Sequence, residues 1–342
     1  MSPSASARPV FAALALAFAA FAARPAAAQQ LVDSTFVPQV ARPAFGSTHP
    51  VLLFDEGHGN PLTLADRFRP FQELLEADGY RVVRSPQRFS TALLKLANVL
   101  VVVDPLDRIG DTVLPGYPAF THDEIRVVDD WVSAGGALLL VAEQAPFGRS
   151  AAGLASALRV TMSNGVSTDP AHEDSVSANP GCLLFSRDNG LLADHAITRG
   201  RDSLEIVRRV ATWTGQSLDG PPGAVRLLAL SKDARDVGIG DSVVARGSAA
   251  GLAFMRGHGR VVVLGDAAML TAQLNVTPSP DRPPGVPLEM GINRTDLDNR
   301  QFTLNVLHWL SGVLDPPPPP LGPRRTPPMP HAGATRASRP RR

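Results

Sequence analysis

Short, continuously apolar segments alternate with amphipathic segments in the first half of the chain. The apolar segments span 51–54, 99–103 and 137–141, and Asp, Glu, Gly or Asn residues follow closely after each of them. A continuous apolar run of this length is typical of a strand that is covered on both sides. A further short strand is predicted over 80–83.

Residues at helical spacing separate these predicted strands. The segment 65–78 repeats apolar residues every three or four positions and is closed by Gly79. Thr121 and Glu124 have the spacing of a capping box, which predicts that a helix begins after Thr121 and ends before Gly135. Other helices are predicted over 93–96, 150–158 and 302–314.

The second half of the chain is richer in predicted strands. Short apolar segments at 182–185, 206–212 and 225–230 are separated by Gly, Pro, Asn and Asp, and a hairpin is predicted over 252–264. Alternation of strands and helices favours the α/β class, with a mostly parallel sheet, right-handed crossovers and helices on both faces. We therefore expect one domain over 50–314, with a β-rich insertion in its second half.

The N-terminus is typical of a secretory signal. A weakly basic start precedes the apolar stretch 10–23, and Ala26 and Ala28 give a small-residue cleavage pattern before Gln29. We expect a signal peptide over 1–28, a leader segment over 29–49, and export to the periplasm or beyond. The stretch is short for a membrane span, and an uncleaved anchor is the alternative. No second run of spanning length follows, so no membrane span is expected after cleavage.

Composition and charge narrow the classes of partner. One cysteine among 342 residues excludes a disulfide scaffold and a zinc ribbon. The two terminal segments hold eight basic residues and one acid, which leaves 25 basic and 31 acidic residues between 29 and 314. An acidic body lacks the basic stripe that nucleic acid requires, so no nucleic-acid partner is expected. The segment 315–342, with ten prolines and six arginines, is predicted to be a disordered tail, either simply solvated or binding an acidic envelope surface.

Polar side chains follow the predicted strands and the start of the last helix. Because ligands of open parallel sheets bind beyond the carboxyl ends of the strands, we expect these side chains to share one pocket. The candidate pocket residues are Asp55, Glu56, His58, Asp104, Glu143, Gln144, Asp266, Asn299 and Arg300. We expect Arg300 to pair with a carboxylate of the pocket and Asn299 to present its amide there.

A structural role competes with a chemical one for several of these residues. Asp55, Asp266 and Asp298 have positions typical of carboxylates that cap loops or helices, and His58 has one typical of a ring that bonds main-chain carbonyls. Metal binding by Asp55 and His58 lacks a third ligand. The sequence has no G-x-S-x-G motif and no phosphate loop, and Cys182 is predicted to be a buried packing residue. No cofactor and no metal is predicted.

Three segments together resemble a known group: 51–60, 120–140 and 298–302. They resemble bacterial exported proteins with a class I glutamine-amidotransferase-like domain of unknown function, a group similar to domains of gliding-motility transporter accessory proteins and of an intraflagellar-transport subunit. The resemblance covers most of 50–314 and implies a flavodoxin-like sheet. Amidotransferases of this fold carry a cysteine on a strand-to-helix turn, whereas Glu143 and Gln144 follow the strand here. Glutaminase activity is therefore not expected.

Three functions follow as hypotheses, the third being an envelope scaffold that docks through the segment 315–342. The first is a non-catalytic exported module that binds a small polar ligand or an envelope protein. The second is a carboxylate- or metal-dependent hydrolase that uses the same strand-end pocket, with Glu143 as general base and His58 as acid or ligand.

Overall fold

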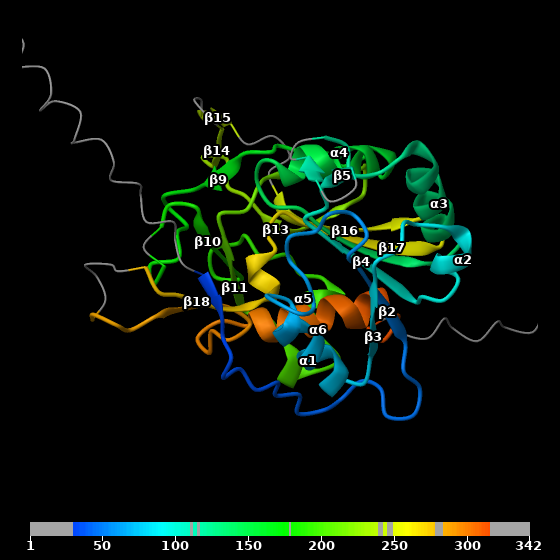
Figure 1. Ribbon diagram of the computed structural model, residues 1–342. Helices are drawn as coiled ribbons and strands as arrows, with labels where there is room; N and C mark the ends of the chain where they lie inside the picture. The colour runs from blue at the N-terminus through cyan, green and yellow to red at the C-terminus, as the bar shows by residue number, and fades with distance from the viewer. Residues whose placement is uncertain are drawn as a thin grey trace, which may run out of the picture.

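A large mixed sheet forms the centre of the computed structural model, which describes residues 30–109, 112–114, 117–177, 179–238, 242–244, 249–277 and 283–314 (Figure 1). In this part of the chain the large sheet has nine strands. Their order is β3 (Arg81–Ser85), β2 (Val51–Asp55), β4 (Val99–Val103), β7 (Ala137–Val141), β17 (Gly259–Leu264), β16 (Ala249–Arg256), β12 (Leu218–Asp219) and β8 (Thr161–Met162), and β13 (Val225–Ala229) also pairs with β16.

The strands from β3 to β17 run parallel, and β16 turns back antiparallel to β17. The carboxyl ends of the central strands are level, because Val103 lies opposite Val141 and Val141 opposite Leu264. The residues that follow β4, β7 and β17 therefore emerge at one edge of the sheet. The expected α/β fold with a mostly parallel sheet is confirmed at this level.

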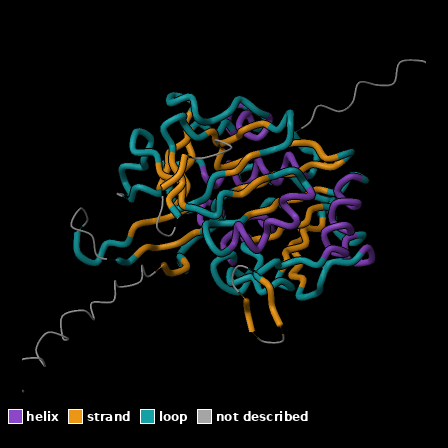
Figure 2. Tube along the Cα trace, turned by 90° about the horizontal axis from the view of Figure 1, so that it is seen from above, coloured by secondary structure: helices purple, strands orange, loops and turns teal. Residues whose placement is uncertain are grey.

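Helices cover both faces of the sheet (Figures 1 and 2). One face carries α1 (Arg69–Ala77) and α6 (Asn299–Leu310), and the other carries α2 (Thr91–Leu94), α3 (His122–Ser133) and α4 (Phe147–Ala157). Alternate residues of β4 pack into the two cores: Val101 and Val103 on the side of α1 and α6, and Val102 on the opposite side. This double burial is the physical reason why these strands are apolar throughout.

The helix boundaries follow local chemistry. The capping box of α3 is present as predicted, with Glu124 N donating to Thr121 Oγ1 at 3.3 Å and Thr121 N donating to Glu124 Oε2 at 2.9 Å. The first helix begins at Arg69 rather than 65, with Pro70 in its first turn, where a missing N–H costs nothing. Asp298 precedes α6 but does not cap it, contrary to expectation: its carboxylate accepts from Arg208 N and Arg209 N.

Smaller β-structures surround the large sheet, most of them in the second half of the chain. They are the pairings β10 (Cys182–Ser186) with β11 (Arg209–Trp213), β14 (Arg235–Val237) with β9 (Val166–Thr168) and β15 (Ser242–Val244), β18 (Ala272–Asn275) with β1 (Gln30–Val32) and β19 (Leu288–Gly291), and β5 (Asp107–Ile109) with β6 (Thr112–Leu114). Short helical turns are α5 (Ala196–Arg199), η1 (Ser203–Glu205) and η2 (Ala268–Leu270).

The leader segment packs along the body. Its strand β1 pairs with β18, Ala44 N donates to Asp78 Oδ1 at 2.9 Å, and the ring of Phe45 meets that of Tyr80 with centroids 4.8 Å apart. The predicted signal peptide, 1–28, and the predicted tail, 315–342, lie outside the described residues. None of the helices in the described part of the chain combines the length and apolar character needed to cross a membrane.

Candidate functional site

Three of the predicted pocket residues form an acidic cluster at the carboxyl edge of the sheet, in which Asp104 and Asp266 are buried and Glu143 is half-buried. Asp104 follows β4, Glu143 follows β7 and Asp266 follows β17. Glu143 N donates to Asp104 Oδ1 at 2.8 Å, and Ala267 N donates to Glu143 Oε1 at 3.3 Å. The parallel strands therefore bring together carboxyl groups that are far apart in sequence.

The acidic cluster favours the protonated form of its members. Burial raises the pKa of Asp104 and of Asp266 well above their ordinary value, and the neighbouring charge of Glu143 raises both further. Burial also raises the pKa of Glu143, against hydrogen bonds from main-chain N–H groups and the positive charge of Arg67. A set of coupled acids in a desolvated edge binds protons more tightly than separate acids in water.

The members of this cluster differ in how well their oxygens are satisfied. Asp266 is enclosed and accepts from Trp213 N, Ala268 N and Met269 N at 3.0–3.3 Å. Asp104 is equally enclosed, with φ of 44°, and its Oδ2 has no hydrogen-bond partner within the described structure. Gln144 Oε1 is also buried without a partner there. The acceptor capacity that remains is therefore on Asp104 and Gln144.

Asp55 and His58 form a second buried group with Glu124. The imidazole Nδ1 of His58 lies 2.8 Å from Asp55 Oδ1, and its Nε2 lies 3.0 Å from Glu124 Oε1. The rings of Phe89 and Phe120 lie on the imidazole, with centroids 4.4 and 4.7 Å away. One imidazole thus joins the end of β2 to the first turn of α3.

The electrostatics of this second group favour a charged histidine. Burial opposes protonation of His58, but hydrogen bonds and charges from Asp55 and Glu124 outweigh it and raise the pKa of His58. Burial likewise opposes ionisation of Glu124, but His58 and the Thr121 main chain and hydroxyl lower the pKa of Glu124 to about 2. The expected main-chain partner of His58 is thus replaced by two carboxylates.

Asn60 connects the two groups. Its Nδ2 donates to Val103 O at 2.8 Å and to Asp55 Oδ2 at 3.3 Å, directly before Asp104 in sequence. Asp55 also accepts from Gly57 N at 3.0 Å, as expected of a loop carboxylate. Neither Asp55 nor His58 has exposed surface.

The structure does not bring the other candidates into this edge. Glu56 accepts from Leu64 N and pairs with Arg84 on the side of β3. Asn299 is buried, and its side-chain amide forms hydrogen bonds with main-chain groups of Ala211 and Met269. Arg300 meets no carboxylate within the described structure; it donates to Ile292 O, and its guanidinium lies 5.2 Å from the ring centroid of Phe36.

Sequence reasoning missed two residues of this edge. Glu124 was identified as part of a capping box, and nothing in its spacing connects it to His58, 66 positions earlier. Arg67 lies in a segment predicted to be helical and was not a candidate, yet its positive charge lowers the pKa of Glu143. Cys182 is buried as predicted, and burial raises the pKa of its thiol to about 12. Among the described residues, no group of three or more His, Cys, Asp or Glu side chains is arranged to hold a metal ion.

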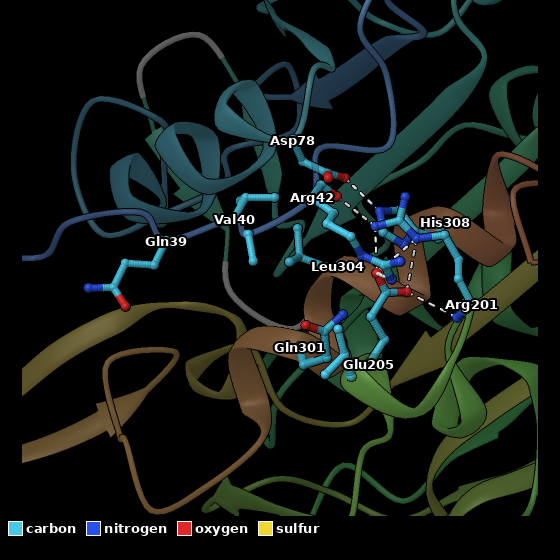
Figure 3. A pocket seen from close by; sticks show the side chains of 11 residues that line it. Gln39, Val40, Arg42, Asp78, Arg201, Glu205, Gln301, Leu304 and His308 are labelled. Carbon is cyan, nitrogen blue, oxygen red and sulfur yellow. Dashed lines mark hydrogen bonds and ion pairs between the residues drawn. The ribbon is translucent and has the colours of Figure 1, made fainter.

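A polar cavity of about 60 Å³ lies between the leader segment and α6 (Figure 3). Arg42 and Arg201 converge on Glu205, at 2.9 and 2.8 Å, and His308 Nε2 lies 2.6 Å from Asp78 Oδ2. Most of the charges that line the cavity are thus paired with one another. We interpret this network as the attachment of the leader segment to the body.

Comparison with known proteins yields structural similarity alone. No protein-family model and no curated protein matches the sequence. The mmIFT52 N-terminal domain superposes with a TM-score of 0.54 at 14% identity, covering 76% of this chain and 97% of that one. A ThuA-like protein from Bacteroides uniformis gives a TM-score of 0.41 at 12% identity, covering 80% of this chain and 94% of that one. The first of these similarities shows a shared fold.

Proposed function

We propose that this chain is an exported, class I glutamine-amidotransferase-like domain that has no nucleophile and binds a small polar ligand or an envelope protein without catalysis. The observation that carries the proposal is the turn between β7 and α4. Glu143 and Gln144 occupy it, and Glu143 N is bound to Asp104. Cys182, the single thiol of the chain, is buried with a raised pKa, and a thiol rather than a thiolate is a poor nucleophile.

The hydrogen bonds that two strand-end carboxylates already make within the protein support the same proposal. Asp55 and Asp266 have no exposed surface and accept hydrogen bonds from main-chain N–H groups. Half-buried Glu143 remains to meet a ligand, beside Gln144, whose Oε1 is buried without a partner in the described structure. A site of this kind offers acceptors to a ligand rich in hydroxyl or amide donors.

One observation favours a second candidate, a carboxylate hydrolase. Burial raises the pKa of both Asp104 and Glu143, and their mutual repulsion favours a carboxylic acid beside a carboxylate. Such a pair can divide the roles of general acid and general base, with half-buried Glu143 nearest to solvent. This candidate requires no metal.

The two candidates are separated by measuring binding and turnover on the same protein. The full chain is screened against small polar ligands by ligand-observed NMR, and for hydrolysis of glutamine, esters, glycosides and amides. We expect binding without turnover, lost in Glu143→Gln and retained in Glu73→Gln, a control on the surface of α1. Turnover that disappears in Glu143→Gln would replace the binding module by the hydrolase.

Export is tested separately. Expressed in a bacterial host, the chain is expected in the periplasm or medium with Gln29 as its first residue. Cytoplasmic protein that retains residues 1–28 would contradict this part of the proposal.

A further inference from the structure

A pocket of about 570 Å³ lies in the second half of the chain, where the antiparallel pair of β10 and β11 meets α5. Its lining is Arg187, Asp188, Asp194, Arg199, Ile206 and Arg208. The volume is in the range of pockets that bind small molecules. None of these residues belongs to the strand-end group described above.

Two arginines face each other at the end of the β10–β11 pair. Ser186 lies opposite Arg209 in the ladder, and Arg187 N donates to Arg208 O at 3.1 Å, which continues the pairing by one position. Like charges directly opposite in an antiparallel pair are destabilising. The side chain of Arg208 makes no hydrogen bond or ion pair with any residue in the described structure. Arg208 is exposed, so its guanidinium is accessible to a ligand.

The Arg187 guanidinium is held in place before any ligand arrives. It donates to Thr198 O at 3.2 Å and to Val207 O at 3.4 Å, and Asp194 lies 3.5 Å away. Asp194 also pairs with Arg199 at 3.0 Å, so one carboxylate positions two guanidinium groups. A fixed guanidinium loses little entropy when it binds an anion. Nε and Nη2 of Arg187 already donate to main-chain oxygens, so Arg187 offers one charged edge, and the guanidinium of Arg208 is the one that can bind a carboxylate with two parallel hydrogen bonds.

We infer that this pocket binds an acidic sugar, a molecule with one carboxylate and several hydroxyl groups. Three arginines and two aspartates give the lining an excess of one positive charge, which matches a monoanion. Asp188 and Asp194 would repel the second charge of a phosphate but can accept hydrogen bonds from sugar hydroxyls. The side chain of Ile206, half-buried in the lining, offers an apolar surface to a sugar ring.

The test compares galacturonate, galactose and inorganic phosphate by calorimetry on the full chain at low salt. We expect saturable binding of galacturonate, at least tenfold tighter than that of galactose or phosphate. The variant Arg208→Gln should weaken galacturonate roughly 10- to 100-fold, because a charged hydrogen bond is lost. Arg209→Gln is the matched control: it is adjacent and exposed, and it points to the opposite side of the strand.

Each outcome decides the inference. Absence of saturable galacturonate binding, equal binding of galactose, tighter binding of phosphate, or an unchanged Arg208→Gln would overturn it, with circular dichroism confirming that the variants are folded. The result is independent of the proposed function at the strand ends, because Glu143→Gln must leave galacturonate binding unaltered. If galacturonate does not bind but another small polar ligand does, and Glu143→Gln abolishes that binding, the acidic-sugar inference is overturned and the strand-end proposal remains intact.

Discussion

Replacing Glu124 by Gln removes the charge that faces His58. Glutamine at the third position of a capping box can still accept from Thr121 N, so the start of α3 remains capped. The amide also keeps the volume of the side chain between Phe89 and the imidazole. The variant places an NH2 group where an oxygen lay 3.0 Å from His58 Nε2, so it removes both the negative charge and the acceptor at that position.

The expected loss of stability is about 2 kcal/mol near pH 6. Lowering the pKa of Glu124 from 4.5 to about 2 corresponds to about 3 kcal/mol in favour of the ionised form. Asp55 stays on the other side of the imidazole and continues to stabilise its charge. The variant should therefore lose part of that free energy rather than the larger penalty of leaving a buried charge alone.

The loss of stability in Glu124→Gln should become smaller both below and above pH 6. The lowered pKa of Glu124 means that its contribution is present above pH 4.5 and is lost as the pH falls towards about 2. The pKa of His58 is raised above 6.5, so its contribution is present below pH 6.5 and is lost as the pH rises through the folded-state pKa. Urea unfolding of both proteins at pH 3, 6 and 9 should show the largest difference at pH 6.

Equal penalties at all three pH values would refute this reasoning, as would an NMR titration that places the pKa of His58 below 6.5. The control is Asp123→Asn, which removes an exposed acid from the same first turn of α3. Its partner Arg126 is also exposed, and such surface pairs contribute at most about 1 kcal/mol.

Two further substitutions test the buried edge and the backbone. Because the pKa of Asp104 is raised in the folded protein, its contribution to stability is lost as the pH rises above 3.8. Asp104→Asn should therefore be more stable than the natural protein between pH 5 and pH 8. A urea midpoint that falls in the variant would contradict this. Gly291→Ala should prevent folding or cost more than about 3 kcal/mol, because a Cβ would lie 1.9 Å from Thr271 O. Gly190→Ala, at similar positive φ in open space, should cost about 1–2 kcal/mol, and equal thermal shifts of the two variants would remove the steric explanation.

Much of the architecture could be predicted because local signals and burial agreed. The apolar segments 99–103 and 137–141 form strands that are buried on both faces, and the capping box at Thr121 starts α3 where expected. The strand β1 could not be predicted, because its pairing with β18 joins residues about 240 positions apart and leaves little periodicity in a three-residue segment. The start of α1 was misplaced because apolar residues of the preceding turns continue the helical spacing.

The candidate site was harder to predict, for a reason of geometry. Parallel strands carry their carboxyl ends to one edge, so the meeting of Asp104, Glu143 and Asp266 follows from the topology alone. Whether a carboxylate at that edge faces solvent or main-chain N–H groups depends on the loops, and the sequence gives no measure of loop direction. Asn299 shows the consequence: it lies at the start of the expected helix, yet its amide holds Ala211 and Met269 together.

The same reasoning explains why the pocket lined by Arg187, Arg199 and Arg208 could not be predicted from the sequence. Arg187, Arg199 and Arg208 are ordinary surface residues by composition, in a body that carries a net charge of −6 between 29 and 314. Their juxtaposition depends on the register of β10 with β11, which the short apolar segments do not specify. The like charges of Arg187 and Arg208 face each other in this register, and Asp194 compensates only Arg187 of the two, so Arg208 is the charge that an anionic ligand would neutralise. Substitution of Arg208 should for that reason stabilise the ligand-free protein slightly while it weakens ligand binding, an opposition that a purely structural arginine would not produce.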